Sequence, residues 1–230
     1  CPGVRPRKRD VVTLRAHSLR VALVLFVLFI LAPCFSLGCR SETPRPSSCP
    51  AGFRADDARA EAILAKLGDV PAGARARDHA LAKGGISFCF GHIGVSSVTT
   101  SGAVLIDEAL GKDEAAARVG HLLTHVAEGL RVEPRGGEDE SCEVITERAL
   151  AAEAAALSLE LGLRRAFGVG ASARVRYEFE GAYWAAPEEA RQGLVLDYLR
   201  AHPDGAPGID ALASGYARRC REARGAPSAR

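Results

Sequence analysis

The chain has 230 residues, of which 47% are hydrophobic and 25% are charged, and its formal net charge is +2. Residues 1–38 contain six basic residues and one acidic residue, so the remainder carries 24 basic and 27 acidic residues, a net charge of −3. Because nucleic-acid binding needs a clustered positive field, this balance excludes nucleic acid as a partner of the main part of the chain. That part is long enough for one globular domain with its own core.

The N-terminal segment has the layout of a secretory signal. Basic residues come first, an apolar run follows at residues 21–32, and Gly38 precedes Cys39. The end of this segment resembles a bacterial lipoprotein signal, in which a cysteine after a small residue becomes lipidated, although Leu37 breaks the usual order of small residues. The resemblance implies a lipid anchor on Cys39 and a periplasmic or outer-envelope location. The alternatives are cleavage after Gly38 without lipidation, or an uncleaved anchor.

The composition divides the chain into four segments. We predict an export segment over residues 1–39, a flexible tether rich in proline and serine over 40–52, a single globular domain over 53–222 and a disordered tail over 223–230.

Four cysteines follow Cys39, namely Cys49, Cys89, Cys142 and Cys220. An even number in an oxidising compartment predicts two disulfides, and the sequence leaves all three pairings open. Cys89 lies in an apolar run, so a buried free thiol is the alternative for that residue.

Hydrophobic periodicity and capping residues predict a mostly helical domain. Helices are expected over residues 55–67, 113–129, 142–165 and 187–202, with a last helix ending near Cys220. Asp113 is expected to cap the second of these helices and Ser141 the third. A glycine-, proline- and arginine-rich connection is expected after the first of these helices.

Two β-type runs, 84–91 and 102–107, predict a small sheet or hairpin, and a short strand or turn is expected within 174–187. The fold class predicted from these elements is α+β, mostly α. The aromatic residues in the last segment either pack in the core or stack on a sugar or peptide. They are Tyr177, Phe179, Tyr183 and Trp184.

His121 and His125 are four residues apart in a predicted helix, so their imidazoles lie on one face and can meet one metal ion. A third ligand is expected from the long helix that follows. Glu153 is the first candidate there, because no Lys or Arg lies three or four residues away on either side, and an unpaired buried carboxylate is costly. Glu147 is the second candidate, whereas Glu160 is expected to pair with Arg164, four residues further on.

This arrangement resembles the zincin metallopeptidases that bind zinc with two histidines and a downstream glutamate. The resemblance covers about residues 88–160 and implies a zinc site formed by His121, His125 and Glu153. In that family, a glutamate directly after the first histidine is the general base. Here this position is Leu122, which accepts no proton, and Glu128 lies one turn beyond the second histidine.

Three functions are therefore open. The first is an exported, lipid-anchored envelope protein with a degenerate metallopeptidase-like domain that acts as a binding or scaffold module and not as a peptidase. The second is an active zinc-dependent hydrolase with an atypical base. The third is a structural envelope lipoprotein without metal, in which the histidines only pack. The sequence does not identify a protein or peptide partner.

Overall fold

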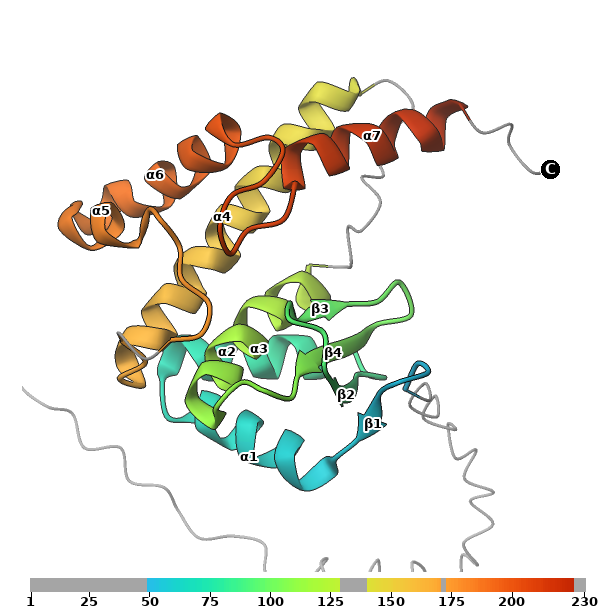
Figure 1. Ribbon diagram of the computed structural model, residues 1–230, viewed down its shortest axis with the longest axis vertical. Coiled ribbons are helices and arrows are strands. Elements are labelled where there is room, and N and C mark those ends of the chain that lie inside the picture. Colours follow the sequence, from blue (N-terminus) through green and yellow to red (C-terminus); the bar gives the residue numbers. More distant parts are fainter. Residues whose placement is uncertain (1–48, 129–139, 171–172, 226–230) are drawn as a thin grey trace, which may run out of the picture. The chain divides into compact units, whose positions relative to one another are not determined.

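A computed structural model describes residues 49–128, 140–170 and 173–225 (Figure 1). The export segment, Cys39 and residues 40–48 of the tether lie outside the described residues, as does Gly129, the expected end of the second predicted helix. Within the described ranges, no helix is long and apolar enough to cross a membrane.

The described chain is mostly helical with one small sheet, which confirms the predicted α+β class. The helices are α1 (Asp57–Gly68), α2 (Pro71–Leu81), α3 (Lys112–Ala127), α4 (Cys142–Ala166), α5 (Glu180–Ala185), α6 (Glu188–Ala201) and α7 (Leu212–Gly225). The strands are β1 (Arg54–Ala55), β2 (Ser87–Gly91), β3 (Ser97–Val98) and β4 (Ala103–Asp107).

The sheet has the strand order β1-β2-β4-β3. Strands β2 and β4, which correspond to the two predicted β-runs, pair in parallel and therefore do not form a hairpin with each other. The hairpin is instead β3–β4, since the chain turns between Thr99 and Ala103 through Gly102, whose φ of 87° favours glycine. The short strand β3 lies in the connection between the two predicted β-runs.

Helix α2 occupies the stretch that was predicted to be a connection, so this expectation was wrong. Pro71 stands in the first turn of the helix, where its missing N–H is not needed. Gly73 allows the helix to approach α1, because a Cβ atom there would lie 2.5 Å from the backbone oxygen of Leu67. Residues that usually break helices therefore serve here as a helix start and a contact point.

Other expectations are refined at the element ends. Asp113 does not cap α3, because the capping position is Gly111. Within 174–187 the chain makes a turn, in which the N–H of Glu180 donates to the backbone oxygen of Tyr177, and helix α5 then follows. Helix α7 continues to Gly225, beyond the predicted domain end at residue 222. Ser141 does cap α4 as predicted, since its hydroxyl accepts a hydrogen bond from the N–H of Val144.

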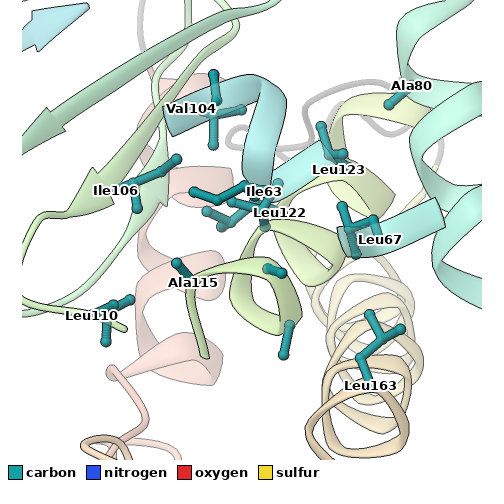
Figure 2. Packing of buried hydrophobic residues seen from close by; sticks show 14 of the residues in the cluster. Ile63, Leu67, Ala80, Val104, Ile106, Leu110, Ala115, Leu122, Leu123 and Leu163 are labelled. Atoms are coloured by element: carbon teal, nitrogen blue, oxygen red, sulfur yellow. The ribbon is translucent and has the colours of Figure 1, made fainter. Parts of the chain in front are cut away.

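Helix α4 lies between two hydrophobic clusters (Figure 1). The first cluster joins the sheet to α1, α2 and α3, and it receives Leu163 from α4 (Figure 2). The second joins α4 to the chain around Tyr177 and to α6 and α7. The predicted aromatic group belongs to this second core: Tyr177, Phe179 and Tyr183 are buried and Trp184 packs against them.

Two disulfides are present, Cys49–Cys89 and Cys142–Cys220. The first joins the chain before β1 to β2, so Cys89 is not a free thiol. The second joins the start of α4 to α7. Disulfides form and persist in oxidising compartments, so this pair indicates an exported environment.

Leu67 tests the first cluster, because it is completely buried. We expect Leu67→Ala to lower the free energy of unfolding by about 2 to 5 kcal/mol, measured by urea denaturation, since it removes buried methyl groups and leaves a cavity. Leu81→Ala is the matched control, because Leu81 is 43% exposed and its loss should cost little. Equal effects of the two substitutions would contradict the assigned core.

Candidate metal centre

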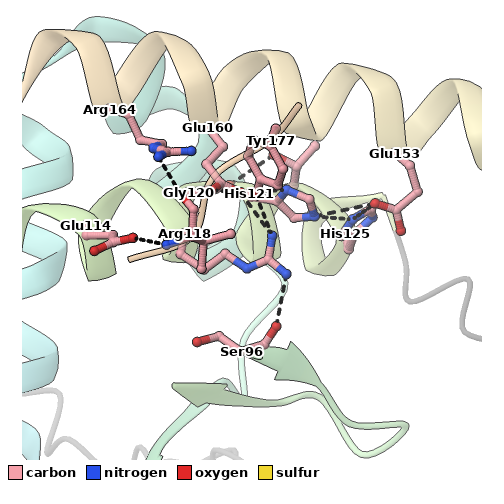
Figure 3. Close-up of polar contacts among 12 residues, drawn as sticks. Ser96, Glu114, Arg118, Gly120, His121, His125, Glu153, Glu160, Arg164 and Tyr177 are labelled. Atoms are coloured by element: carbon pink, nitrogen blue, oxygen red, sulfur yellow. Dashed lines mark hydrogen bonds and ion pairs between the residues drawn. The ribbon is translucent and has the colours of Figure 1, made fainter. Parts of the chain in front are cut away.

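Helix α3 carries both histidines, whose side chains lie beside Glu153 and Glu160 of α4 (Figure 3). His121 is 4% exposed and His125 is partly buried. Their Nε2 atoms are 3.1 Å apart, as expected for imidazoles that lie four residues apart on one helix face.

Glu153 of α4 completes a group of three. Its Oε2 atom lies 3.4 Å from Nε2 of His121 and 3.3 Å from Nε2 of His125. The carboxylate is 7% exposed. The three side chains predicted from the sequence therefore converge, and this buried group could hold a metal ion.

The spacing of the three donor atoms is compatible with a small metal ion. A tetrahedral zinc with bonds of about 2.0 to 2.1 Å separates neighbouring donors by about 3.3 to 3.4 Å. The three observed separations are 3.1, 3.3 and 3.4 Å. A small cation can therefore lie at bonding distance from all three atoms without rearrangement of α3 or α4.

The close approach of α3 to α4 depends on Gly120. A Cβ atom at this position would lie 2.4 Å from Cδ1 of Leu163, a residue of α4 that is 1% exposed. Without a side chain at Gly120, the two helices pack with little between them. His121 follows this contact directly, so its ring reaches the glutamates of α4.

Glu160 also belongs to the cluster, which the sequence did not indicate. Its Oε2 atom lies 3.1 Å from Nδ1 of His121 and accepts a hydrogen bond from Arg118 at 3.0 Å. Its Oε1 atom accepts one from the Tyr177 hydroxyl at 2.8 Å. Glu160 thus faces the ring nitrogen that points away from Glu153, an arrangement that orients metal-binding histidines in many proteins.

The predicted pairing of Glu160 with Arg164 was wrong. Arg164 donates instead to the backbone oxygen of Val175 at 2.6 Å and lies 3.5 Å from Glu180. The reason is tertiary: α3 packs along this face of α4 and brings Arg118 to Glu160, 42 residues away in sequence. A second hydrogen bond, to the backbone oxygen of Ser96, connects Arg118 to the segment before β3.

The charged groups in this cluster shift one another's pKa values. Burial by itself would raise the pKa of Glu160, but the charge of Arg118 and the contact with His121 lower it to about 2. Burial would likewise raise the pKa of Glu153, and hydrogen bonds with the two imidazoles hold it well below its usual range. Burial and Arg118 oppose protonation of His121, yet the two carboxylates raise its pKa overall.

Tyr216 of α7 binds the other oxygen of Glu153. Its hydroxyl donates to Oε1 at 2.7 Å, and the side chain is buried. Desolvation and the charge of Glu153 raise the pKa of this phenol, so it remains a hydrogen-bond donor. No local sequence pattern indicated this contact, because the two residues are 63 positions apart.

A cavity of about 170 Å³ adjoins the three donor atoms. Its wall includes the donors together with Leu122, Glu128 and Tyr216. Leu122 is 4% exposed and also packs in the first hydrophobic cluster, whereas Glu128 is an exposed residue at the end of α3. The position that carries the general base in zincins is therefore apolar, and a carboxylate lies elsewhere on the same wall.

Glu147, the second candidate ligand, does not join the cluster. It is exposed and accepts a hydrogen bond from Nε of Arg200 on α6 at 2.8 Å.

No protein-family model, curated protein or solved structure matches this chain. The functional interpretation therefore depends on the geometry of the cluster.

The low pKa of Glu160 predicts acid sensitivity of the metal-free protein. Unfolded Glu160 would titrate near 4.5 and folded Glu160 near 2, so the unfolded chain binds more protons between these values. The stabilisation from Glu160 is complete above about pH 4.5 and is lost as the pH falls toward 2. We expect Glu160→Gln to be less stable than the wild type at pH 7, by on the order of 2 to 3 kcal/mol, and this difference to shrink at acid pH.

Urea denaturation at pH 7 and pH 3, after chelator treatment, measures this effect. Glu178→Gln is the matched control, because Glu178 also accepts a tyrosine hydroxyl, from Tyr198 at 2.9 Å, but lies on the surface. A stability difference for Glu160→Gln that is the same at both pH values would contradict the assigned ionisation.

Proposed function

We propose that this chain is an exported zinc-binding domain built on a zincin-like plan, which acts as a binding or scaffold module and not as a peptidase. One observation carries the proposal: the near-equilateral triangle formed by Nε2 of His121, Nε2 of His125 and Oε2 of Glu153, with sides of 3.1 to 3.4 Å. This donor set, two imidazoles and one carboxylate, is one that zinc favours.

The charge of the cluster supports a bound cation. When both imidazoles are neutral, the two negative charges of Glu153 and Glu160 face the single positive charge of Arg118, which leaves a net charge of −1. An uncompensated buried charge is costly. The two carboxylates also favour a proton on His121 in the metal-free protein, since they raise its pKa. Zinc would compete with that proton, so metal binding should weaken as the pH falls.

The three donors leave zinc one coordination position, and the adjoining cavity supplies space for a water molecule or a ligand group there. When bound, zinc would supply a Lewis acid at this position. The chain's own residues orient the donors: Glu160 faces Nδ1 of His121, and Tyr216 binds Glu153. These contacts are the kind that raise metal affinity by fixing ligand orientation.

Leu122 argues against peptidase activity of the zincin type. Loss of a general base typically removes a factor of about 10² to 10⁴ in rate. The second candidate function, a zinc hydrolase with an atypical base, is favoured by Glu128, a carboxylate on the cavity wall. Its exposure and its place one turn beyond His125 distinguish it from the usual base position.

Export is supported by the two disulfides. Lipidation of Cys39 and an envelope location remain part of the proposal, carried by the sequence of the N-terminal segment. In this arrangement, residues 40–48 and the Cys49–Cys89 disulfide would connect the anchor to the sheet.

Metal content tests the zinc site directly. We expect the purified protein to contain one zinc per chain by elemental analysis, and the His121→Ala and His125→Ala variants to contain almost none, because each removes a donor. His79→Ala is the control, since His79 is exposed on α2. A wild-type protein that takes up no zinc after incubation and desalting would refute the site and favour a metal-free structural role.

Restoring the base tests the zincin-like plan. We expect no peptide hydrolysis by the wild type and zinc-dependent hydrolysis by Leu122→Glu, with a gain on the order of 10² or more over background, measured with a mixture of fluorogenic peptides. Hydrolysis by the wild type that disappears in Glu128→Gln would instead support the second candidate function. A folded, zinc-loaded Leu122→Glu protein without activity would contradict a zincin-like arrangement.

A further inference from the structure

We infer that Tyr216 is a positioning residue of the metal centre, which orients Glu153 toward the metal, and that the Cys142–Cys220 disulfide holds Tyr216 in place. This inference rests on the proposed zinc binding, and it assigns to α7 the task of completing a site whose donors all lie on α3 and α4.

The two oxygens of Glu153 have different partners. The hydroxyl of Tyr216 donates to Oε1, while Oε2 faces the two imidazoles. A carboxylate on a long side chain can rotate, and ordering it on metal binding costs entropy. Tyr216 fixes the rotation beforehand, because its buried hydroxyl engages the oxygen that the metal does not need.

Helix α7 buries few of its side chains completely. Of its 14 residues, only Tyr216 and Cys220 are buried. They lie four residues apart, so both project from the same face of the helix. One binds Glu153 and the other bonds covalently to Cys142, and both partners belong to α4.

The disulfide therefore supplements a modest hydrophobic contact, in which Leu212, Ala213 and Tyr216 of α7 pack in or against the second cluster. Most helical stability in proteins comes from packing of an apolar face, and α7 buries only two side chains completely. The covalent bond keeps α7 beside α4 and keeps the Tyr216 hydroxyl near Glu153. The wall of the cavity depends on the same bond, since Ile209, Leu212 and Tyr216 all contribute to it.

Zinc affinity of Tyr216→Phe tests the positioning role. We expect the dissociation constant, measured by competition with a chromogenic chelator, to increase about 10- to 100-fold relative to the wild type. We also expect the visible absorption of the cobalt-substituted protein to change, because the carboxylate meets the metal in a different orientation. Tyr198→Phe is the control: its hydroxyl also donates to a glutamate, Glu178, away from the cavity.

A second experiment tests the role of the disulfide. The double variant Cys142→Ser/Cys220→Ser should lose affinity about as much as Tyr216→Phe, and adding Tyr216→Phe to it should have little further effect. Cys49→Ser/Cys89→Ser is the matched control, since that disulfide joins the sheet and not α7. The zinc dissociation constant of this variant should stay at the wild-type value even if the protein becomes less stable. Circular dichroism confirms that each variant is folded under the assay conditions.

Each outcome has one meaning. If the wild type binds zinc tightly and Tyr216→Phe matches it in both affinity and cobalt spectrum, the positioning role is overturned. Unchanged affinity in Cys142→Ser/Cys220→Ser overturns the role of the disulfide. If the wild type binds no zinc, the proposed function fails, and this inference fails with it.

Discussion

The contact between α3 and α4 at Gly120 is the constraint on which the rest of the site depends. Because Gly120 has no side chain, Leu163 fits against α3 and the two helices lie close together. The next residue, His121, then reaches two carboxylates of α4 at once, Glu153 through Nε2 and Glu160 through Nδ1. A side chain at Gly120 would collide with Leu163, which would have to shift, close to buried charges that are costly to leave without partners.

The polar cluster lies where two hydrophobic cores meet. One core joins α3 to the sheet and to α1 and α2, and the other joins α4 to α6 and α7. Arg118, Glu160 and Tyr177 connect these halves by hydrogen bonds that satisfy one another in a region with little water. Glu160 of this network also lies 3.1 Å from Nδ1 of His121, so packing and metal binding would draw on the same contacts.

Metal binding and hydrolysis need different residues. The group of His121, His125 and Glu153 could hold a metal ion. Hydrolysis of the zincin type also needs a base beside the metal, and Leu122, the residue after the first histidine, contributes instead to the hydrophobic core. Under the proposed function, the metal would therefore serve as a structural or binding element.

Local features of this protein were predictable from the order of its residues. The Ser141 cap, the spacing of His121 and His125, and the absence of a basic neighbour near Glu153 depend on residues a few positions apart, where helix geometry sets the relation. The long-range contacts were not predictable, because they join residues from different elements. Glu160 and Arg118 are 42 positions apart, Glu153 and Tyr216 are 63 apart, and Cys142 and Cys220 are 78 apart. Helix α2 was missed for a related reason: Pro71 suits a first helical turn locally, but the role of Gly73 depends on α1, which packs against it.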